Sequence, residues 1–312
     1  MKTIFQIFQH KISLVNKLKF FFKLSMKNNR LFIFNEQLAK IDKEVGAINS
    51  PDIPKLFSKF PLDEFGKLLL DIPQQYPHLK EFFPSMAAKE VQKNWTGSYG
   101  EVLLYQSVAF IKTMVYGYSF LTGKNIAHAK VLDFGCGWGR LIRLLYKYVP
   151  VSNIYGLDPW DQSINICKQN RIKGNLALSD NVPLSLPFSQ QFDLIFAYSV
   201  FTHLSEKTTR IVLSTLRKYV SEDGILVITV RPKEYWHIHN NGEIATEMLK
   251  LHNDQGFAFK PHNLPPIDGD ITYGDTSMTL AYFEKSFPNW KIAAVECNDM
   301  DLYQVILFLR PA

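Results

Sequence analysis

Residues 131–140, VLDFGCGWGR, decide the fold of this chain. The apolar run at 130–134 predicts a short strand, and glycines follow it at every second position, at Gly135, Gly137 and Gly139. A glycine turn directly after a buried strand lets backbone N–H groups approach a bound ligand. Beyond this turn, predicted strands alternate with predicted helices, which indicates a mostly parallel sheet covered on both faces.

The expected elements extend in both directions from the turn. Further strands are expected at 153–157, 192–198 and 224–230, and helices at 141–148, 162–170 and 206–219. Two last strands, at 291–297 and 303–309, are joined by the tight turn 298–301 and should pair antiparallel. Upstream, residues 101–120 carry apolar side chains on more than one face, over a length that suits a buried helix. The fold class is therefore α/β, with a doubly wound, mostly parallel sheet and an antiparallel last strand.

The chain divides into three predicted parts. Residues 1–30 form a basic, apolar tail, and residues 31–100 form a helical cap or linker that is rich in proline between 49 and 93. Residues 101–312 form the main domain, with an insertion at 231–289. A loop region that long inside a compact domain is usually functional, so we expect it to recognise the substrate. Its candidate residues are Tyr235, His237, His239, His252 and His262, with the polar run 268–277.

The net positive charge of the chain is confined to the tail. The formal net charge is +6, but residues 1–30 hold seven Lys and Arg and no acid, so the remainder sums to 6 − 7 = −1. A neutral domain is a poor candidate for binding nucleic acid. The tail is too interrupted by lysine to span a bilayer. It either makes peripheral contact with an anionic membrane, or is an unordered extension, or precedes a start of translation at Met26.

The cysteines and histidines do not suggest a metal. The three cysteines, Cys136, Cys167 and Cys297, are odd in number and far apart, so they predict neither a disulfide framework nor a zinc site and fit a reducing cytosol. His237 and His239 are spaced to share one strand face, but nothing completes a ligand set. We therefore expect a cytoplasmic protein without a bound metal.

Two acids frame the glycine turn. Asp133 precedes the glycines, where it suits an ammonium group better than a pyrophosphate, and Asp158 ends the next strand, where it can accept ribose hydroxyls. The G-x-G-x-G spacing also differs from the dinucleotide pattern G-x-G-x-x-G. The pattern indicates a cofactor with a ribose, an ammonium and no pyrophosphate, as in S-adenosylmethionine.

The order DFGCGWGR, LDPW, FDLIFAYSVFTHL and DGILVITV resembles the bacterial class I S-adenosylmethionine-dependent methyltransferases over about residues 95–230. The resemblance implies a seven-stranded Rossmann-like sheet, a methyltransferase activity and S-adenosylmethionine as cofactor. It also implies cofactor contacts from five segments: Asp133, Phe134, Gly135, Cys136, Gly137, Gly139 and Arg140; Asp158, Pro159 and Trp160; Asp180 and Asn181; Tyr198 and Ser199; Ser98 and Gly100.

Several residues carry two interpretations. The segment 97–100 either closes over the methionine carboxylate or is an ordinary helix start capped by Ser98. His203 is the candidate catalytic base, because its loop should point toward the transferred methyl group; alternatively its imidazole bridges two loop groups without titrating. Cys136 and Trp138 are expected to pack, since a nucleophile beside a sulfonium would itself be methylated.

The acceptor is the least constrained prediction. The segments TYGDTSM and YQVILFLRP resemble methyltransferases found among surface-polysaccharide and secondary-metabolite genes, which implies a small-molecule acceptor, most simply a hydroxyl of a sugar or secondary metabolite. The alternatives are a lipid or quinone at a membrane surface, a non-catalytic S-adenosylmethionine-binding module, and a nicotinamide oxidoreductase. Residues 197–200 lack the Asn/Asp-Pro-Pro-aromatic segment of DNA amino-methyltransferases, and no cysteine follows a proline, so methylation of DNA bases is disfavoured. The sequence gives no indication of oligomeric state.

Overall fold

The computed structural model describes residues 34–239 and 242–312, so the predicted tail, residues 1–30, lies outside the described residues. Its centre is a seven-stranded sheet in the order β3-β2-β1-β4-β5-β9-β8. The α/β fold class is confirmed, including the antiparallel strand near the end of the chain: β9 pairs antiparallel with both β5 and β8. The strands are β1 (Val131–Phe134), β2 (Ile154–Asp158), β3 (Asn175–Leu178), β4 (Phe192–Ala197), β5 (Val220–Val230), β8 (Trp290–Cys297) and β9 (Val305–Pro311).

The central strands are apolar throughout because both faces of the sheet are covered. Along β4, Leu194 and Phe196 pack into one buried cluster, whereas Ile195 and Ala197 pack into a second. Successive side chains of a strand point to opposite faces, so a strand buried on both sides reads as a continuous apolar run.

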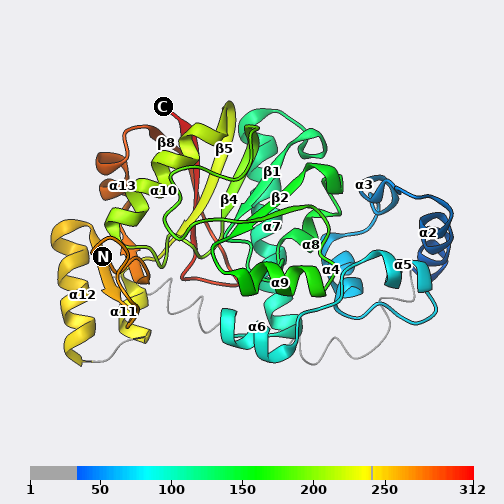
Figure 1. The fold of residues 1–312 in the computed structure, drawn as a ribbon, viewed down its shortest axis with the longest axis horizontal. Helices are drawn as coiled ribbons and strands as arrows, with labels where there is room; N and C mark the ends of the chain where they lie inside the picture. Colours follow the sequence, from blue (N-terminus) through cyan, green and yellow to red (C-terminus); the bar gives the residue numbers. More distant parts are fainter. Residues whose placement is uncertain (1–33, 240–241) are drawn as a thin grey trace.

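Helices cover the two faces of this sheet (Figure 1). One face packs against α7 (Gly100–Thr122), α8 (Ile142–Leu145) and α9 (Asp161–Gln169), and the other against α10 (Glu206–Tyr219) and α13 (Leu280–Ser286). The predicted buried helix at 101–120 is present as α7, but one side of it reaches solvent: Tyr116 and Phe120 are 73% and 74% exposed. No helix in the described part of the chain combines the length and apolarity needed to cross a membrane.

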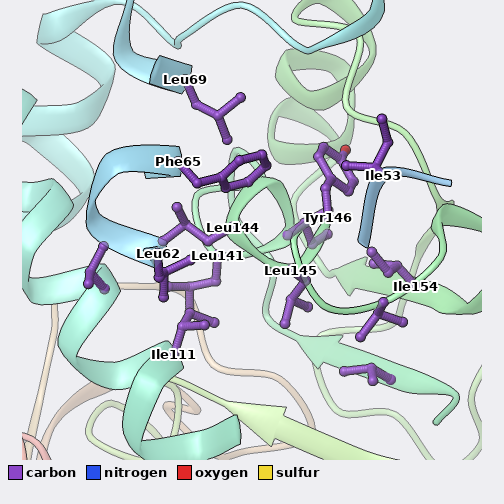
Figure 2. Close-up of a cluster of buried hydrophobic side chains, with 14 of the residues drawn as sticks. Ile53, Leu62, Phe65, Leu69, Ile111, Leu141, Leu144, Leu145, Tyr146 and Ile154 are labelled. Atoms are coloured by element: carbon purple, nitrogen blue, oxygen red, sulfur yellow. The ribbon is translucent and has the colours of Figure 1, made fainter. Parts of the chain in front are cut away.

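The N-terminal helices share the core of the sheet domain. They are α2 (Asn35–Ala47), α3 (Ile53–Leu56), α4 (Leu62–Leu70), α5 (Pro77–Phe82) and α6 (Lys89–Thr96). Figure 2 shows Leu62, Phe65 and Leu69 of α4 beside Leu144 and Tyr146 at α8. One apolar cluster therefore runs from these helices to the sheet, and it fixes them against the segment that follows the glycine turn.

The insertion is more regular than the loop region that the sequence suggested. It contains α11 (Glu234–His239), α12 (Gly242–Gln255), α13 and a two-stranded sheet of β6 (Phe257–Pro261) and β7 (Gly274–Met278). A small core of its own, centred on Trp236 and Met248, makes this possible. In Figure 1, α11 and α12 lie at the opposite end of the molecule from α2 and α5.

One strand was not predicted, and one predicted helix is shorter than expected. The strand is β3, whose four residues are half-buried or exposed. The helix expected at 141–148 is reduced to the single turn α8, because hydrogen bonds three residues apart, such as Leu144 N to Leu141 O (3.0 Å) and Lys147 N to Leu144 O (3.3 Å), tighten the backbone on both sides.

Candidate functional site

A cavity of about 500 Å³ lies at the carboxyl ends of β1, β2 and β4. The strand order reverses direction at β1. From β1 the chain continues to β2 and β3 on one side of the sheet, and then returns to β4 and β5 on the other side of β1. Open α/β sheets bind ligands at such a switch point. Its lining includes Asp133, Phe134, Gly135, Cys136, Gly137, Trp138, Arg140, Asp158, Pro159, Trp160, Asp180, Asn181, Tyr198, Ser199 and His203.

The glycine turn is held against the end of β2. The backbone N–H groups of Gly135 and Cys136 both donate to the Leu157 carbonyl, at 2.8 and 3.0 Å. Gly135 has a φ of 81°, and a Cβ there would lie 2.5 Å from Val200. At Gly137, φ is 54° and the nearest atom to an added Cβ is a Trp95 ring carbon at 3.8 Å. The turn therefore needs glycine for its backbone, and at Gly137 it lies against the Trp95 ring.

Asp133 is a buried carboxylate with an unsatisfied oxygen. It is 2% exposed, and its Oδ2 has no hydrogen-bond partner. Burial raises the pKa of Asp133 well above its usual range; the Arg140 guanidinium lowers it and the Asp158 carboxylate raises it further. A buried polar atom without a partner is rare in folded proteins and calls for a ligand or water to complete it.

Asp158 ties the glycine turn to the segment after β2. Its Oδ2 accepts from the Gly137 N–H at 2.9 Å and its Oδ1 from the Trp160 N–H at 3.0 Å. Burial raises the pKa of this carboxyl, while those two backbone donors lower it. Each carboxylate oxygen can accept more than one hydrogen bond, so Asp158 retains capacity for a ligand.

Arg140 and Tyr198 contact each other in the lining of the cavity. The Arg140 guanidinium lies over the Tyr198 ring, 4.9 Å from its centroid. The Tyr198 hydroxyl donates to Asp301 Oδ2 at 3.0 Å and accepts from Asn298 Nδ2 at 3.2 Å. The turn between β8 and β9 therefore holds Tyr198 in place. Among the described residues of the lining, Arg140 is the one side chain with a permanent positive charge.

Ser199 bends the chain directly after β4. Its φ is 60°, which is uncommon for a residue with a side chain. Three groups hold it there: its N–H donates to Thr229 Oγ1 at 2.8 Å, its hydroxyl lies 3.2 Å from Thr202 Oγ1, and Gln304 Nε2 donates to that hydroxyl at 3.1 Å. The bend directs the chain from β4 along the cavity toward His203.

Both ring nitrogens of His203 are engaged. Its Nδ1 lies 2.7 Å from the Gly274 carbonyl and its Nε2 lies 3.1 Å from Nη2 of Arg231. A carbonyl can only accept and a guanidinium can only donate, so the ring is neutral with its proton on Nδ1. Burial, and then the Arg231 charge, lower the pKa of His203 to about 4. This geometry favours the bridging interpretation of His203 over the catalytic one.

Arg231 is the centre of the network behind His203. Besides the imidazole, its Nη1 donates to the Thr202 carbonyl and to Asp275 Oδ1, both at 2.7 Å. Burial alone would raise the pKa of Asp275, but the charge of Arg231 and the hydrogen bond from Tyr235 outweigh it and hold that pKa below its usual value. Sequence reasoning did not single out Arg231; its position at the end of β5, beside the loop after β4, was the available signal.

Beyond the residues of β1, β2 and β4 the cavity is lined by Trp95 and Thr96 of α6, by His203, and by the insertion residues 264–267, Thr272 and Tyr273; these residues are called the outer wall. The wall is fastened to the loop after β4, because Gly274 N donates to the His203 carbonyl at 2.8 Å and Ser205 N to the Thr272 carbonyl at 3.0 Å. Helix α6 and the insertion, far apart in sequence, thus close the same cavity.

Comparison with known proteins agrees with this geometry. Residues 131–224, from β1 into β5, match a family model described as a methyltransferase domain. Over these residues the chain is similar to methyltransferase domains. A malonyl-[acyl-carrier protein] O-methyltransferase of Halalkalibacterium halodurans is 25% identical over 130 residues, which are 39% of this chain and 46% of that protein. An uncharacterized protein of Rickettsia prowazekii is 29% identical over 131 residues, 40% of this chain and 51% of that protein. The chain spans about half the length of the curated relatives it matches.

Solved structures resemble the chain more distantly. A methyltransferase from Clostridium acetobutylicum, described as S-adenosylmethionine-dependent, is 14% identical with a TM-score of 0.47, over 71% of this chain and 96% of that one. The glycopeptide N-methyltransferase MtfA, solved with sinefungin, is 12% identical with a TM-score of 0.45, over 66% of this chain and 94% of that one.

Three residues predicted at the cofactor lie outside the cavity. Gly139 has a φ of 79°, and a Cβ there would lie 2.8 Å from Ile172, so its glycine serves packing. Gly100 lines a separate cavity of about 20 Å³. The Ser98 hydroxyl donates to Gln106 Oε1 at 3.2 Å, and α7 begins at Gly100 without a side-chain cap, so the alternative of a helix start capped by Ser98 is wrong. Trp95 and Thr96, which sequence reasoning missed, line the cavity instead.

The remaining candidates occupy structural positions. Cys136 and Trp138 are 5% and 3% exposed, as expected of packed residues. A hydrogen bond with Cys167, and then burial, raise the pKa of the Cys136 thiol. Of the insertion histidines, His252 bonds Ser277 Oγ at 2.8 Å and His262 bonds Asp275 Oδ2 at 3.2 Å.

His237 is exposed on α11, and His239 ends that helix, so their spacing does not place them on one strand face. Over residues 34–239 and 242–312 no group of three metal-ligating side chains gathers.

Proposed function

We propose that this chain is an enzyme that transfers a methyl group from S-adenosylmethionine to a hydroxyl of a small molecule. The observation that carries the proposal is the combination, in one cavity, of a glycine turn with two buried carboxylates. Asp133 has an unsatisfied oxygen, and Asp158 has spare acceptor capacity. This donor and acceptor set fits a ligand with a positive amine and a ribose, and lacks the N–H pattern of a pyrophosphate site.

The cofactor would be held by residues of this chain at both ends. Asp133, with its unsatisfied oxygen, would receive the amine of the methionine part beside the glycine turn, and Arg140 would offer a positive charge to its carboxylate. Asp158 would accept the ribose hydroxyls, and Trp160, Asp180 and Asn181 would surround the base. When bound, S-adenosylmethionine supplies a methyl group activated by a sulfonium.

Methyl transfer from a sulfonium depends mainly on the positioning of the acceptor atom and on the exclusion of water from the cavity. The bent segment at Ser199 and the bridged His203 give the cavity a fixed shape, and the outer wall, with Trp95 on one side and Tyr273 on the other, covers it. The relative from Halalkalibacterium halodurans is named an O-methyltransferase, which supports an oxygen as the acceptor atom.

Calorimetry with two cofactors tests the proposal. Titration of the full chain with S-adenosylmethionine, and separately with NAD, should give a binding isotherm for the first and none for the second. Binding of NAD without S-adenosylmethionine would instead identify an oxidoreductase. Binding of S-adenosylmethionine with no methyl transfer to any hydroxyl compound would identify a non-catalytic module.

A further inference from the structure

We infer that the acceptor is an uncharged aromatic molecule that presents a phenolic hydroxyl to the cavity. The inference rests on the proposed function and concerns the outer wall, the part of the cavity that the proposed cofactor contacts leave uncovered. Three features of that wall carry it: its lack of charge, the lack of free backbone donors along its segment 264–267, and its aromatic rings.

The outer wall carries no net charge. Among its described residues the ionisable side chains are His203 and Tyr273, and the imidazole is neutral because Arg231 donates to its Nε2. The charged residues of the lining, Asp133, Asp158, Asp180 and Arg140, belong to the proposed cofactor side. A carboxylate or phosphate on the acceptor would therefore meet no cation at this wall, and burying an unpaired charge is costly.

The segment 264–267 offers no hydrogen-bond donor to a polyol. Leu264 N donates to the His262 carbonyl at 2.9 Å, Ile267 N donates to the Asp270 carbonyl at 2.8 Å, and the two residues between them are prolines, which have no N–H. All four side chains are apolar. Sugar oxygens packed against this segment would meet no hydrogen-bond donor, at a cost of about 1–3 kcal/mol for each buried oxygen left without one.

The remaining surface of the wall is aromatic. Tyr273 stacks on His203 with centroids 4.9 Å apart and an interplanar angle of 6°. Trp160, from the proposed cofactor side, lies between the two ends of the wall, 6.1 Å from Tyr273 and 5.8 Å from Trp95, edge-on to the latter. Aromatic rings pack against one another in stacked or edge-to-face geometry, so this surface matches a planar ring.

The chemistry of the wall also selects an acidic hydroxyl. His203 is the outer wall's one conventional base, and its acceptor nitrogen is already occupied by Arg231, which helps to lower its pKa to about 4 after the larger effect of burial. A phenol ionises near pH 10, as tyrosine does, so it needs far less help from a base than an aliphatic hydroxyl.

In the transfer, the phenolic oxygen forms a bond to the methyl carbon while the carbon–sulfur bond breaks and its electron pair stays on sulfur. The phenolic proton passes to solvent. The sulfonium thereby becomes a neutral thioether, and no oxidant or further reactant is needed.

A binding experiment tests the inference. The full chain, saturated with S-adenosylhomocysteine, is titrated calorimetrically with catechol, with its carboxylate counterpart protocatechuate and with methyl glucoside. Catechol should bind about tenfold more tightly than either of the others, because it brings no charge and a single hydroxyl besides the reacting one, whereas protocatechuate brings a carboxylate and methyl glucoside brings three further hydroxyls. Transfer of a labelled methyl group to catechol, and not to methyl glucoside, is the matching activity readout.

A variant with a positive charge in the outer wall tests whether the missing charge excludes a carboxylate. Leu264 is 45% exposed, so Leu264→Arg should fold and should strengthen protocatechuate binding about threefold to fivefold, the value of a partly exposed ion pair. Ile244→Arg, on α12 outside the cavity and 43% exposed, is the matched control and should leave all affinities unchanged.

Equal binding of methyl glucoside or protocatechuate by the unmodified chain, or no catechol binding, would overturn the inference while leaving the cofactor proposal in place. The same holds if Leu264→Arg has no effect on protocatechuate. Failure of S-adenosylhomocysteine itself to bind would overturn the proposed function.

Discussion

Asp158 and His203 show, at the scale of single residues, how burial assigns different tasks to ionisable side chains in one cavity. Asp158 uses its two oxygens to hold the N–H groups of Gly137 and Trp160 and keeps capacity for a ligand. His203 uses both nitrogens to join the Gly274 carbonyl to Arg231 and has none to spare. The first is a binding residue in our account, and the second a positioning residue.

Replacement of Asp158 should weaken the binding of the cofactor. Asp158→Ala is expected to reduce the affinity for S-adenosylhomocysteine by roughly 1–3 kcal/mol, the value of hydrogen bonds to a charged group that is lost from a buried site. Calorimetric titration measures it, with Asp223→Ala as control, because the side chain of Asp223 is 86% exposed and far from the cavity lining. An unchanged affinity would place the ribose elsewhere.

His203 should make the fold sensitive to acid. Its pKa is about 4 in the folded chain against an ordinary value of 6.5, so between those values the unfolded state binds more protons. The contribution of His203 to the free energy of unfolding should be fully present above pH 6.5. The free energy of unfolding should then fall by roughly 3 kcal/mol as the pH drops to about 4. Urea unfolding at pH 7 and pH 4.5 measures this loss.

His203→Gln should remove that part of the pH dependence, whereas His237→Gln, at an exposed position on α11, should retain it. An equal pH dependence in the His203→Gln variant and the unmodified chain would contradict the bridging role.

At the scale of elements, the sequence predicted those parts whose signal is local. The glycine turn, Asp133 and Asp158 stand next to buried apolar strands, and the cavity brings them together as expected. β3 was missed because its edge position leaves only four half-buried or exposed residues, without an apolar run. Trp95 and Thr96 were missed because only the folded chain brings α6 and the insertion to the same cavity.

Helix α10 should depend on its cap. The Ser205 hydroxyl accepts from the Thr208 N–H at 3.1 Å and donates to Asp270 Oδ2 at 2.5 Å, so it joins the start of the helix to the insertion. Ser205→Ala should lower the free energy of unfolding by about 0.5–2 kcal/mol, as for other lost caps. Urea denaturation measures this. Ser205→Thr keeps the hydroxyl and should recover most of the loss; equal stability of the Ala and Thr variants would contradict the role of the cap.

At the scale of the whole molecule, the N-terminal helices and the sheet form one cooperative body. Phe65 of α4 is fully buried and contacts Phe57 and Phe83, within the cluster that continues to α8 and the sheet. Sequence reasoning treated residues 31–100 as a separate cap or linker, because the proline-rich stretch interrupts the apolar pattern. Packing across that stretch is a long-range property that no local pattern contains.

This shared core predicts a single unfolding transition. Phe65→Ala should cost about 3–5 kcal/mol, as other deletions of buried aromatic rings do. The loss should appear equally in far-UV circular dichroism and in tryptophan fluorescence. Phe120→Ala, at a position 74% exposed, should leave the stability unchanged. Two separated transitions in the Phe65→Ala variant would show that the helices unfold independently.

The most direct measurement of the central claim is a crystal structure of the full chain with S-adenosylhomocysteine. The account predicts the ligand in the cavity at the ends of β1, β2 and β4, with its ribose hydroxyls on the Asp158 carboxylate and its amine beside Asp133. A ligand bound elsewhere, or a ribose without contact to Asp158, would contradict it.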